Sequence, residues 1–306
     1  MKFSAQVSCY RTTWDDIRAV IKVMEAGCWH GLYHADHFVP PNAPRADEPL
    51  TAYEGYSLIA SAAAITERLQ LGHLVLGNTY RNPALAAKMA GTIDQVSHGR
   101  FMLAIGAGWF KREHEAYGWT FPSMRERSDR LEEAAALVRA LFTSDGPVDY
   151  HGRYYQLDRA PLSPGGFEGR QIPLMIGGTG ERRTLRTLAM YGDILNVDGF
   201  AGRGMSVELY EEKAAVLNRH CENVGRDPAE IRHTALVPTK LTDDQAEADA
   251  FIELIGPTTV AGGADYIVQR LGELGEAGLD EVMFGRLPND AAEFQRFEED
   301  VIAKLR

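Results

Sequence analysis

Short apolar segments alternate with longer amphipathic segments along the whole 306-residue chain, and this alternation constrains the fold more than any other feature. Eight segments read as buried strands, at residues 2–9, 31–36, 69–77, 99–108, 172–178, 193–199, 231–237 and 279–285. Helices are expected between them, at residues 14–27, 51–66, 83–97, 126–143, 181–191, 206–224 and 264–277. Strands that alternate with helices at this spacing pair in parallel, and eight of them favour closure. We predict an α/β fold, a (β/α)8 TIM barrel, with residues 1–306 as a single domain.

One polar segment, residues 144–171, departs from this rhythm. It follows a helix with a clear apolar stripe, residues 126–143, and precedes the fifth strand at 172–178. We interpret it as an insertion before strand five and as a candidate lid.

Composition narrows the class of protein. The net charge is −11 and no long basic run occurs, which disfavours binding to nucleic acid or to a membrane surface. No apolar run approaches the ~20 residues of a membrane span, and the first residues reach charge too soon for a signal peptide. Three scattered cysteines, Cys9, Cys28 and Cys221, favour a reducing cytoplasm over a disulfide framework.

A barrel of this kind places its active site at the carboxyl ends of the strands. Polar and glycine residues stand at four of these ends: His34, Asp36 and His37; Gly77, Asn78, Thr79 and Tyr80; Gly106, Ala107, Gly108 and Trp109; Gly177, Gly178, Thr179 and Gly180. We expect these four strand ends to form the functional site.

The second strand end, HADHF at residues 34–38, allows three interpretations. A metal site would need further ligands on other strands, and strand one carries no His or Asp. Asp36 and His37 could instead only cap a strand before Pro40. In the third interpretation His37 performs acid–base chemistry and Asp36 sets its tautomer.

Two further segments add contacts for a flat ligand. Asn78 and Thr79 could hydrogen-bond a ring edge, or could cap the next helix. In GAGWFKREHEAYG, residues 106–118, the glycines permit close approach to the backbone, while Trp109 and Phe110 offer flat apolar surface. Lys111 and Arg112 supply positive charge in an acidic chain.

The segment IGGTGERRTLRTLA, residues 176–189, predicts an anion site. Its strand, glycine turn and helix leave backbone N–H groups free at a helix N-terminus, with Arg182, Arg183 and Arg186 nearby. Glu181 fits a helix start for dipole reasons and is expected to point away from a phosphate. The GGxG pattern is not the dinucleotide fingerprint, and no GxSxG, Walker or HExxH motif occurs.

These segments together resemble the bacterial luciferase-like flavin monooxygenase superfamily, and within it the oxidoreductases that use the deazaflavin coenzyme F420. The resemblance rests on ADHF, LVLGNTYRNPALAAKMAGTIDQVSHGRFMLAIGAGWF, EHEAYG, RSDRLEEA and IPLMIGGTGERRTLRTLAMYGDILNV, and it is weaker in the last third. It implies a barrel that binds F420 at its mouth, with FMN as the alternative cofactor, usually as a homodimer.

The resemblance also implies residue roles. Asp36 and His37 match an Asp–His pair beside the deazaflavin, with the histidine as proton donor or acceptor and no metal. The predicted cofactor-binding residues are Asp36, Leu74, Val75, Gly77, Asn78, Ala107, Gly108, Arg112, Gly177, Gly178, Thr179, Gly180 and Glu181. Leu74 and Val75 match a bulge with a non-proline cis peptide, and Gly177, Gly178, Gly180 and Glu181 match the phosphate-binding stretch. The predicted walls of the substrate pocket are Phe38, Tyr80, Trp109, Phe110 and Arg286. Arg286 is expected to meet an anionic substrate or the acidic tail of the cofactor, or else to pair with Asp290.

Two departures shape the functional prediction. The F420-dependent glucose-6-phosphate dehydrogenases carry a glutamate where this chain has Trp109, so we do not predict sugar-phosphate oxidation. Bacterial luciferase has an arginine where this chain has Ala107, which disfavours an FMN phosphate clamp of that type. We predict an F420-dependent oxidoreductase that moves a hydride between deazaflavin and a small organic substrate. The alternative is an FMN-dependent monooxygenase using oxygen. A silent flavin-binding relative would tolerate His37→Ala.

Overall fold

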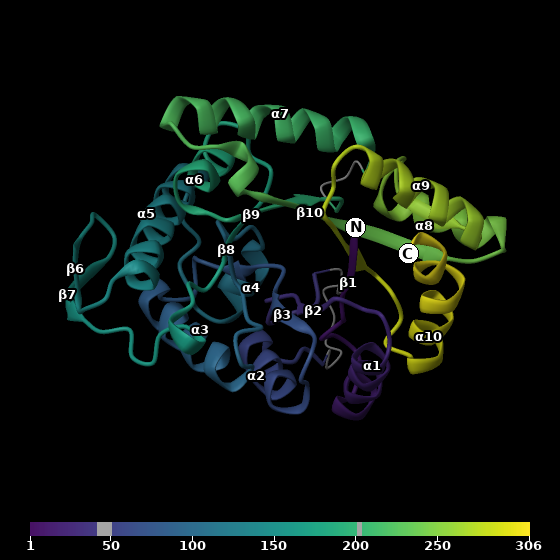
Figure 1. The fold of residues 1–306 in the computed structure, drawn as a ribbon, viewed down its shortest axis with the longest axis horizontal. Helices are drawn as coiled ribbons and strands as arrows, with labels where there is room; N and C mark the ends of the chain where they lie inside the picture. Colours follow the sequence, from purple (N-terminus) through teal and green to yellow (C-terminus); the bar gives the residue numbers. More distant parts are fainter. Residues whose placement is uncertain (42–50, 201–203) are drawn as a thin grey trace.

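The computed structural model describes residues 1–41, 51–200 and 204–306, and it confirms the predicted TIM barrel (Figure 1). Parallel strands form a ring in the order β3, β2, β1, β12, β10, β9, β8, β5, β4. Their bounds are β1 Lys2–Gln6, β2 Gly31–His34, β3 Gln70–His73, β4 Leu76–Gly77, β5 Leu103–Gly106, β8 Leu174–Gly177, β9 Ile194–Asp198, β10 Arg232–Leu241 and β12 Glu281–Gly285. The helices outside the ring are α1 Trp14–Ala26, α2 Gly55–Ile65, α3 Pro83–Val96, α4 Lys111–Ala116, α5 Met124–Thr143, α6 Thr184–Tyr191, α7 Val207–Val224, α8 Gln245–Ile255, α9 Ala264–Glu276 and α10 Ala291–Asp300.

The ring closes through one interrupted strand. β3 pairs with β2, β4 pairs with β5, and Leu74 and Val75 separate the two halves. The Leu74–Val75 peptide is cis, as the resemblance implied. The amide of Gln6 donates to the Leu74 carbonyl (3.1 Å) and holds the bulge from β1. The strand predicted over residues 69–77 is therefore two short strands around a bulge.

Local sequence signals set the helix ends. α1 begins at a complete capping box, in which Thr13 and Asp16 bond each other's backbone N–H. α3 begins with Pro83 behind the cap Asn82, whose side chain accepts from two N–H groups. α7 ends at Gly225 with a positive φ of 71°, a conformation that favours glycine.

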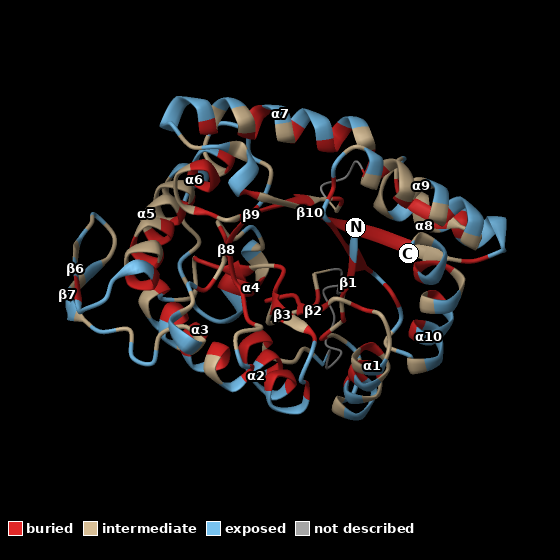
Figure 2. Ribbon diagram, viewed as in Figure 1, coloured by how far each residue is buried: buried red, intermediate tan, exposed pale blue. Residues whose placement is uncertain are grey.

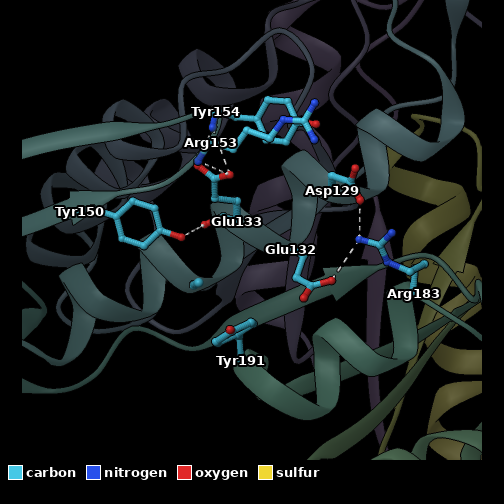
Figure 3. A pocket seen from close by; sticks show the side chains of 9 residues that line it. Asp129, Glu132, Glu133, Tyr150, Arg153, Tyr154, Arg183 and Tyr191 are labelled. Carbon is cyan, nitrogen blue, oxygen red and sulfur yellow. Dashed lines mark hydrogen bonds and ion pairs between the residues drawn. The ribbon is translucent and has the colours of Figure 1, made fainter.

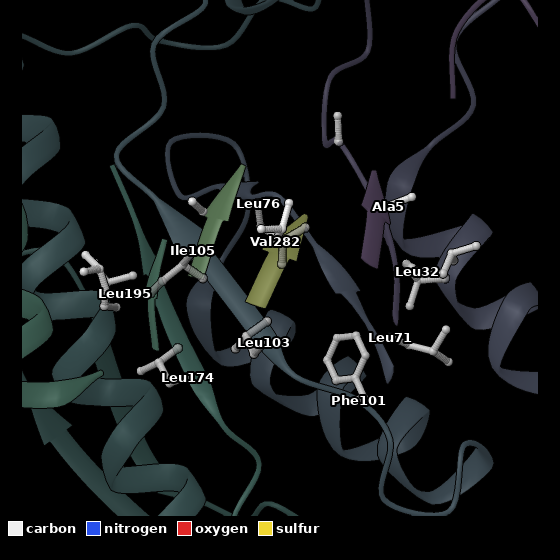
Figure 4. Close-up of a cluster of buried hydrophobic side chains, with 14 of the residues drawn as sticks. Ala5, Leu32, Leu71, Leu76, Phe101, Leu103, Ile105, Leu174, Leu195 and Val282 are labelled. Carbon is white, nitrogen blue, oxygen red and sulfur yellow. The ribbon is translucent and has the colours of Figure 1, made fainter. Parts of the chain in front are cut away.

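Strand alternation divides the buried side chains into two layers. One layer lies between the strands and the helices, where the red segments of Figure 2 face each other, and Figure 4 shows some of its side chains, including Leu32, Phe101 and Leu195. The other fills the barrel interior and contains Tyr33, Leu74, Met102, Ala104, Met175, Ile194, Leu236 and Met283. Because successive side chains point to opposite faces, these two sets show which residues of each strand face the barrel axis and which face the helices.

The predicted insertion has structure of its own. It contains an antiparallel hairpin, β6 Val148–His151 with β7 Gln156–Ala160, and the short helix Phe167–Gly169. The hairpin lies outside α5 at the edge of the molecule (Figure 1). The carboxylate of Glu133 in α5 accepts the N–H groups of residues 153, 154 and 155, which fixes the turn. The lid role stays a prediction. Helices α4, α8 and α10 and the short strand β11 Val260–Gly262 were not predicted.

Candidate active site

The carboxylate of Asp36, at the end of β2, lies at the centre of a buried ionic cluster. Asp36 is 2 % exposed, and Arg81 donates to both of its oxygens, from Nε at 2.8 Å and from Nη2 at 2.5 Å. The backbone N–H of Gly77 donates to the same carboxylate (3.1 Å). Arg81 also pairs with Glu54 from the start of α2. A buried carboxylate of this kind is stable only because its charge is matched and its lone pairs are filled.

The same cluster sets two pKa values. Burial alone would raise the pKa of Glu54, but hydrogen bonds from Ser57 and the Arg81 guanidinium outweigh it and lower that pKa to about 2. For Arg81, burial would lower the pKa, but Asp36 and Glu54 raise it above its usual range. Glu54 and Arg81 therefore stay charged together at neutral pH. The cluster joins the ends of β2, β4 and α2.

His37 is held by a different carboxylate from the predicted one. Its Nδ1 lies 3.0 Å and 3.2 Å from the two oxygens of Glu113, on α4. Glu113 is 1 % exposed and also accepts the N–H of Phe38 (3.1 Å). An ionised carboxylate only accepts, so Nδ1 carries a proton and Nε2 is left for exchange. Among the described residues Asp36 bonds Arg81 and Gly77 rather than His37, so the predicted Asp36–His37 tautomer contact is wrong.

Two aromatic rings orient the imidazole of His37. Trp109 and Phe110 approach it edge-on, with centroid distances of 5.4 Å and 5.7 Å. The His37 side chain keeps 16 % exposure, so one edge of the ring reaches the mouth. His34 is fully buried and follows Tyr33 of the barrel interior, so it faces the helix layer. His37, not His34, can therefore reach a ligand at the mouth.

The floor of the mouth is a flat surface built from glycines and one valine. Gly106 and Gly177 are the last residues of β5 and β8. A Cβ at Gly177 would lie 2.5 Å from Val75 Cγ2, and one at Gly106 would lie 2.7 Å from it. The Val75 side chain thus fills the space that the two glycines leave. Such a surface fits one face of a planar ring, and this supports the predicted places of Leu74 and Val75 behind the cofactor.

The remaining predicted ring contacts line the same opening. Asn78 Nδ2 donates to the hydroxyl of Tyr155 (3.1 Å), which ties the hairpin turn to the site. Gly108 has φ +74° and packs on Thr79, whose hydroxyl bonds His114 Nε2 (2.7 Å). Ala107 packs against the outer core and Arg112 lies on α4.

The predicted phosphate loop follows β8. Gly178 has φ +103°, and a Cβ at Gly180 would lie 2.9 Å from the Thr184 hydroxyl. Helix α6 begins without a side-chain cap, but the N–H of Leu185 in its first turn already donates to the Gly180 carbonyl (3.1 Å), so the anion donors of this loop have to come from the residues before Leu185. Glu181 turns away, as expected, and its carboxylate pairs with Lys213 of α7 (2.6 Å).

The arginines after this loop do not serve it as predicted. Arg183 pairs with Asp129 and Glu132 of α5 at 2.8 Å and 3.1 Å, and Arg186 pairs with Glu132 at 3.1 Å. Their charge is thus matched by α5. Backbone N–H groups of the loop and the exposed Arg182 remain as its candidate anion donors.

The predicted substrate wall is only partly assembled. Phe38 and Tyr80 pack edge to face at 5.3 Å, and the Tyr80 hydroxyl donates to the Asp36 carbonyl (2.5 Å). Trp109 is 62 % exposed at the rim. Arg286 follows β12 on the other side, with its guanidinium 5.8 Å from the Phe200 ring centre. Asp290 instead caps α10, accepting from residues 292 and 293, so the predicted alternative pairing with Arg286 does not form.

A separate hollow of ≈340 Å³ lies between α5, the hairpin turn and α6 (Figure 3). Its charged groups already bond one another: Arg183 bridges Asp129 and Glu132, and Glu133 holds the turn. We therefore assign no ligand to it.

The described residues contain no cluster of three or more potential metal ligands. Within the same part of the chain, no helix is both long and apolar enough to cross a bilayer.

Comparison with known proteins assigns the family. The sequence profile of the luciferase-like monooxygenase family matches residues 2–300. The chain therefore belongs to this enzyme family, as the resemblance predicted, and the match extends through the last third.

Individual relatives refine the comparison. The chain is 30% identical over 322 residues to the F420-dependent glucose-6-phosphate dehydrogenase of Nocardia farcinica, covering 90% of each chain. It is 27% identical to the 5,10-methylenetetrahydromethanopterin reductase of Archaeoglobus fulgidus over 303 residues, covering 82% of this chain and 87% of the relative. Among solved structures, an F420-dependent secondary alcohol dehydrogenase with an F420–acetone adduct shares the fold, with a TM-score of 0.83, 20% identity and coverage of 100% and 99%.

Sequence reasoning missed three residues of this site: Arg81, Glu54 and Glu113. Arg81 stands in the quoted segment GNTYRNP, but its partners lie 45 and 27 residues away along the chain. Glu113 stands in EHEAYG, where two glutamates flank a histidine and only the structure tells which one is buried.

Proposed function

We propose that this protein is an F420-dependent oxidoreductase that transfers a hydride between the deazaflavin and a small organic substrate, with His37 exchanging the accompanying proton. The observation that carries the proposal is that the His37–Glu113 pair and the glycine and valine floor lie at the same rim of the barrel, where the parallel strands end. The relative from Nocardia farcinica, which has F420 in its name, supports the cofactor.

The described residues fit such a group. Gly106, Gly177 and Val75 would support one ring face, and backbone N–H groups of the glycine turn before α6 would take the phosphate. The bound deazaflavin would supply C5 as hydride donor or acceptor. The Asp36–Arg81 cluster fixes the β2 and β4 ends, so His37 keeps its position at the rim.

The role of His37 follows from its contacts. Glu113 holds Nδ1 in its protonated form, which leaves Nε2 to accept a proton from an alcohol or to return one to a carbonyl. Trp109 and Phe110 restrict the ring and shield it from bulk water. Phe38, Tyr80 and Arg286 complete the proposed substrate walls.

An FMN-dependent monooxygenase is the second candidate, favoured by the family's description and by a relative named an FMNH2-dependent dimethylsulfone monooxygenase, which is 27% identical over 197 residues. Ala107 stands where bacterial luciferase has an arginine, and this disfavours the FMN alternative. Trp109 stands where the glucose-6-phosphate dehydrogenases have a glutamate, and this disfavours sugar-phosphate oxidation. We extend the proposal to a homodimer, which a measurement of molar mass in solution would test. We also propose that the protein acts in the cytoplasm.

The first test is a fluorescence titration of the purified protein with F420 and with FMN. We expect F420 to bind at least about tenfold more tightly than FMN, a difference of about 1.4 kcal/mol. A panel of secondary alcohols, enones and imines would then be screened for F420 reduction or reduced-F420 oxidation. His37→Ala should keep F420 binding and lose about 10²- to 10⁴-fold in turnover.

Asp145→Asn, an exposed carboxylate at the far end of α5, is the matched control. Preference for FMN would transfer the protein to the monooxygenase branch. Full turnover by His37→Ala would remove the histidine from the mechanism.

A further inference from the structure

Asp198 is a carboxylate at the mouth that neither the cofactor floor nor the proton pair uses. It is the last residue of β9. Ile194 belongs to the interior cluster, whereas Leu195 and Val197 belong to the outer core. Asn196 also faces inward, because its amide contacts Thr234 (2.9 Å) and the Met283 sulfur (3.4 Å) of the interior. By alternation Asp198 faces the barrel axis at the mouth.

The partners of Asp198 are few. One oxygen, Oδ1, accepts the backbone N–H of Phe200 (2.8 Å). No lysine or arginine of the described residues forms an ion pair with it, and no hydrogen bond to its second oxygen occurs among them. Burial raises the pKa of this carboxyl, although the Phe200 bond opposes the shift. A carboxylate in this position gains stability when a donor reaches it.

The surroundings separate Asp198 from the other charges of the mouth. The Phe200 ring lies on the β12 side, where a Cβ at Gly285 would be 2.8 Å from it. Arg286 lies beyond that ring, 5.8 Å from its centre, and does not pair with Asp198. The Asp36 and Glu113 carboxylates are filled by Arg81 and by His37. Among these three carboxylates of the mouth, Asp198 alone keeps an oxygen for a ligand.

We propose that Asp198 forms a substrate subsite that accepts a hydrogen bond from a protonated amine or a hydroxyl group, opposite the His37 side of the mouth. The proposal deepens the proposed function and rests on it, because the subsite assigns a substrate class to the same pocket. A carboxylate here would repel a phosphate or carboxylate brought to the same wall. The substrate class is therefore a small molecule with a donor group at the end that meets β9.

The experiment uses two probes of equal shape and opposite charge, cyclohexylammonium and cyclohexanecarboxylate. Each is titrated by calorimetry into the full-length protein with and without F420. We expect the amine to bind at least about tenfold more tightly than the carboxylate. Asp198→Asn retains the oxygen that accepts from Phe200 and removes the charge, and it should reduce this preference below about threefold.

Controls separate the two proposals. Asp198→Ser serves as a second variant if the asparagine perturbs folding, and Asp145→Asn should leave the preference unchanged. F420 affinity is measured on each variant by fluorescence and should stay within about twofold. Absence of amine preference in the unmodified protein, or its survival in both Asp198 variants, would overturn the subsite. Absence of F420 binding with the amine preference intact would overturn the proposed function and leave the subsite in place.

Discussion

The two sides of the barrel mouth differ in how their charges are matched. On the side of β2, β4 and α4, which we call the paired side, Asp36 is matched by Arg81 and His37 is matched by Glu113. On the side of β9 and β12, which we call the open side, neither Asp198 nor Arg286 has an ion-pair partner among the described residues. Matched buried charges hold fixed geometry, whereas unmatched ones have binding energy left for a ligand. The paired side is therefore suited to binding the cofactor and transferring the proton, which are the same for every substrate. The open side is suited to binding the substrate, which can vary.

Breaking the paired side at its cation should have the largest effect. Arg81→Ala leaves the buried Asp36 carboxylate without its counter-charge, so we expect the free energy of unfolding to fall by about 3–5 kcal/mol. Urea unfolding followed by circular dichroism measures it. Arg182→Ala, an exposed arginine next to the phosphate loop, is the control and should change stability by less than about 0.5 kcal/mol. Equal effects of the two substitutions would contradict a structural role for the Asp36 cluster.

Glu113→Gln tests whether the second pair controls the proton. The substitution keeps the shape and the bond to Phe38 but removes the charge behind His37. We expect turnover to fall about 10- to 100-fold, the value of a charge-assisted hydrogen bond, with F420 affinity unchanged.

A second glutamate of the same helix is the control. Glu115→Gln, two residues along on the exposed side of α4, should keep the turnover of the unmodified protein. Unchanged turnover in Glu113→Gln would mean that Glu113 contributes packing and not charge.

The floor can be tested by adding one carbon. Gly177→Ala would place a Cβ 2.5 Å from Val75 Cγ2 and push that side chain toward the ring site. Overpacking of this kind costs about 1–3 kcal/mol, so F420 affinity should fall about tenfold. The double variant Val75→Ala with Gly177→Ala should recover most of the loss. If the single variant binds F420 normally, the floor is not where the ring lies.

The smallest expected effect is the pH dependence of stability that comes from His34 and His73, which lie behind the paired side. Burial lowers the pKa of each to about 4, from 6.5 in the unfolded chain. The unfolded chain therefore takes up protons first as the pH falls, and stability present above pH 6.5 is lost towards pH 4. Each histidine should remove about 0.7 kcal/mol of unfolding free energy between pH 7 and pH 6.

Urea unfolding at the two pH values measures this loss. His73 packs against Tyr56 at 4.8 Å, so His73→Phe should be tolerated and should remove about half of the pH dependence. A pH dependence unchanged by that variant would assign it to other groups.

The alternation of apolar strands and amphipathic helices was enough to predict the barrel. The strand period and the helix period can be recognised from neighbouring residues in the sequence. Eight strand–helix repeats then most commonly close into one fold, the TIM barrel. The positions of the strand ends followed, because every parallel strand of a barrel ends at the same rim. This is why His37, Gly106 and Gly177 could be placed at the mouth from the sequence.

The pairing of charges was decided only by the tertiary structure. Glu113 is separated from His37 by 76 residues, and nothing local distinguishes it from Glu115. The sequence marks Asp198 only as the end of a strand. The interior cluster shows that its side chain faces the barrel axis. Periodicity along a chain reports which face a residue takes. The partner across the mouth depends on how far apart the strand ends lie in space, and only the closed barrel sets that distance.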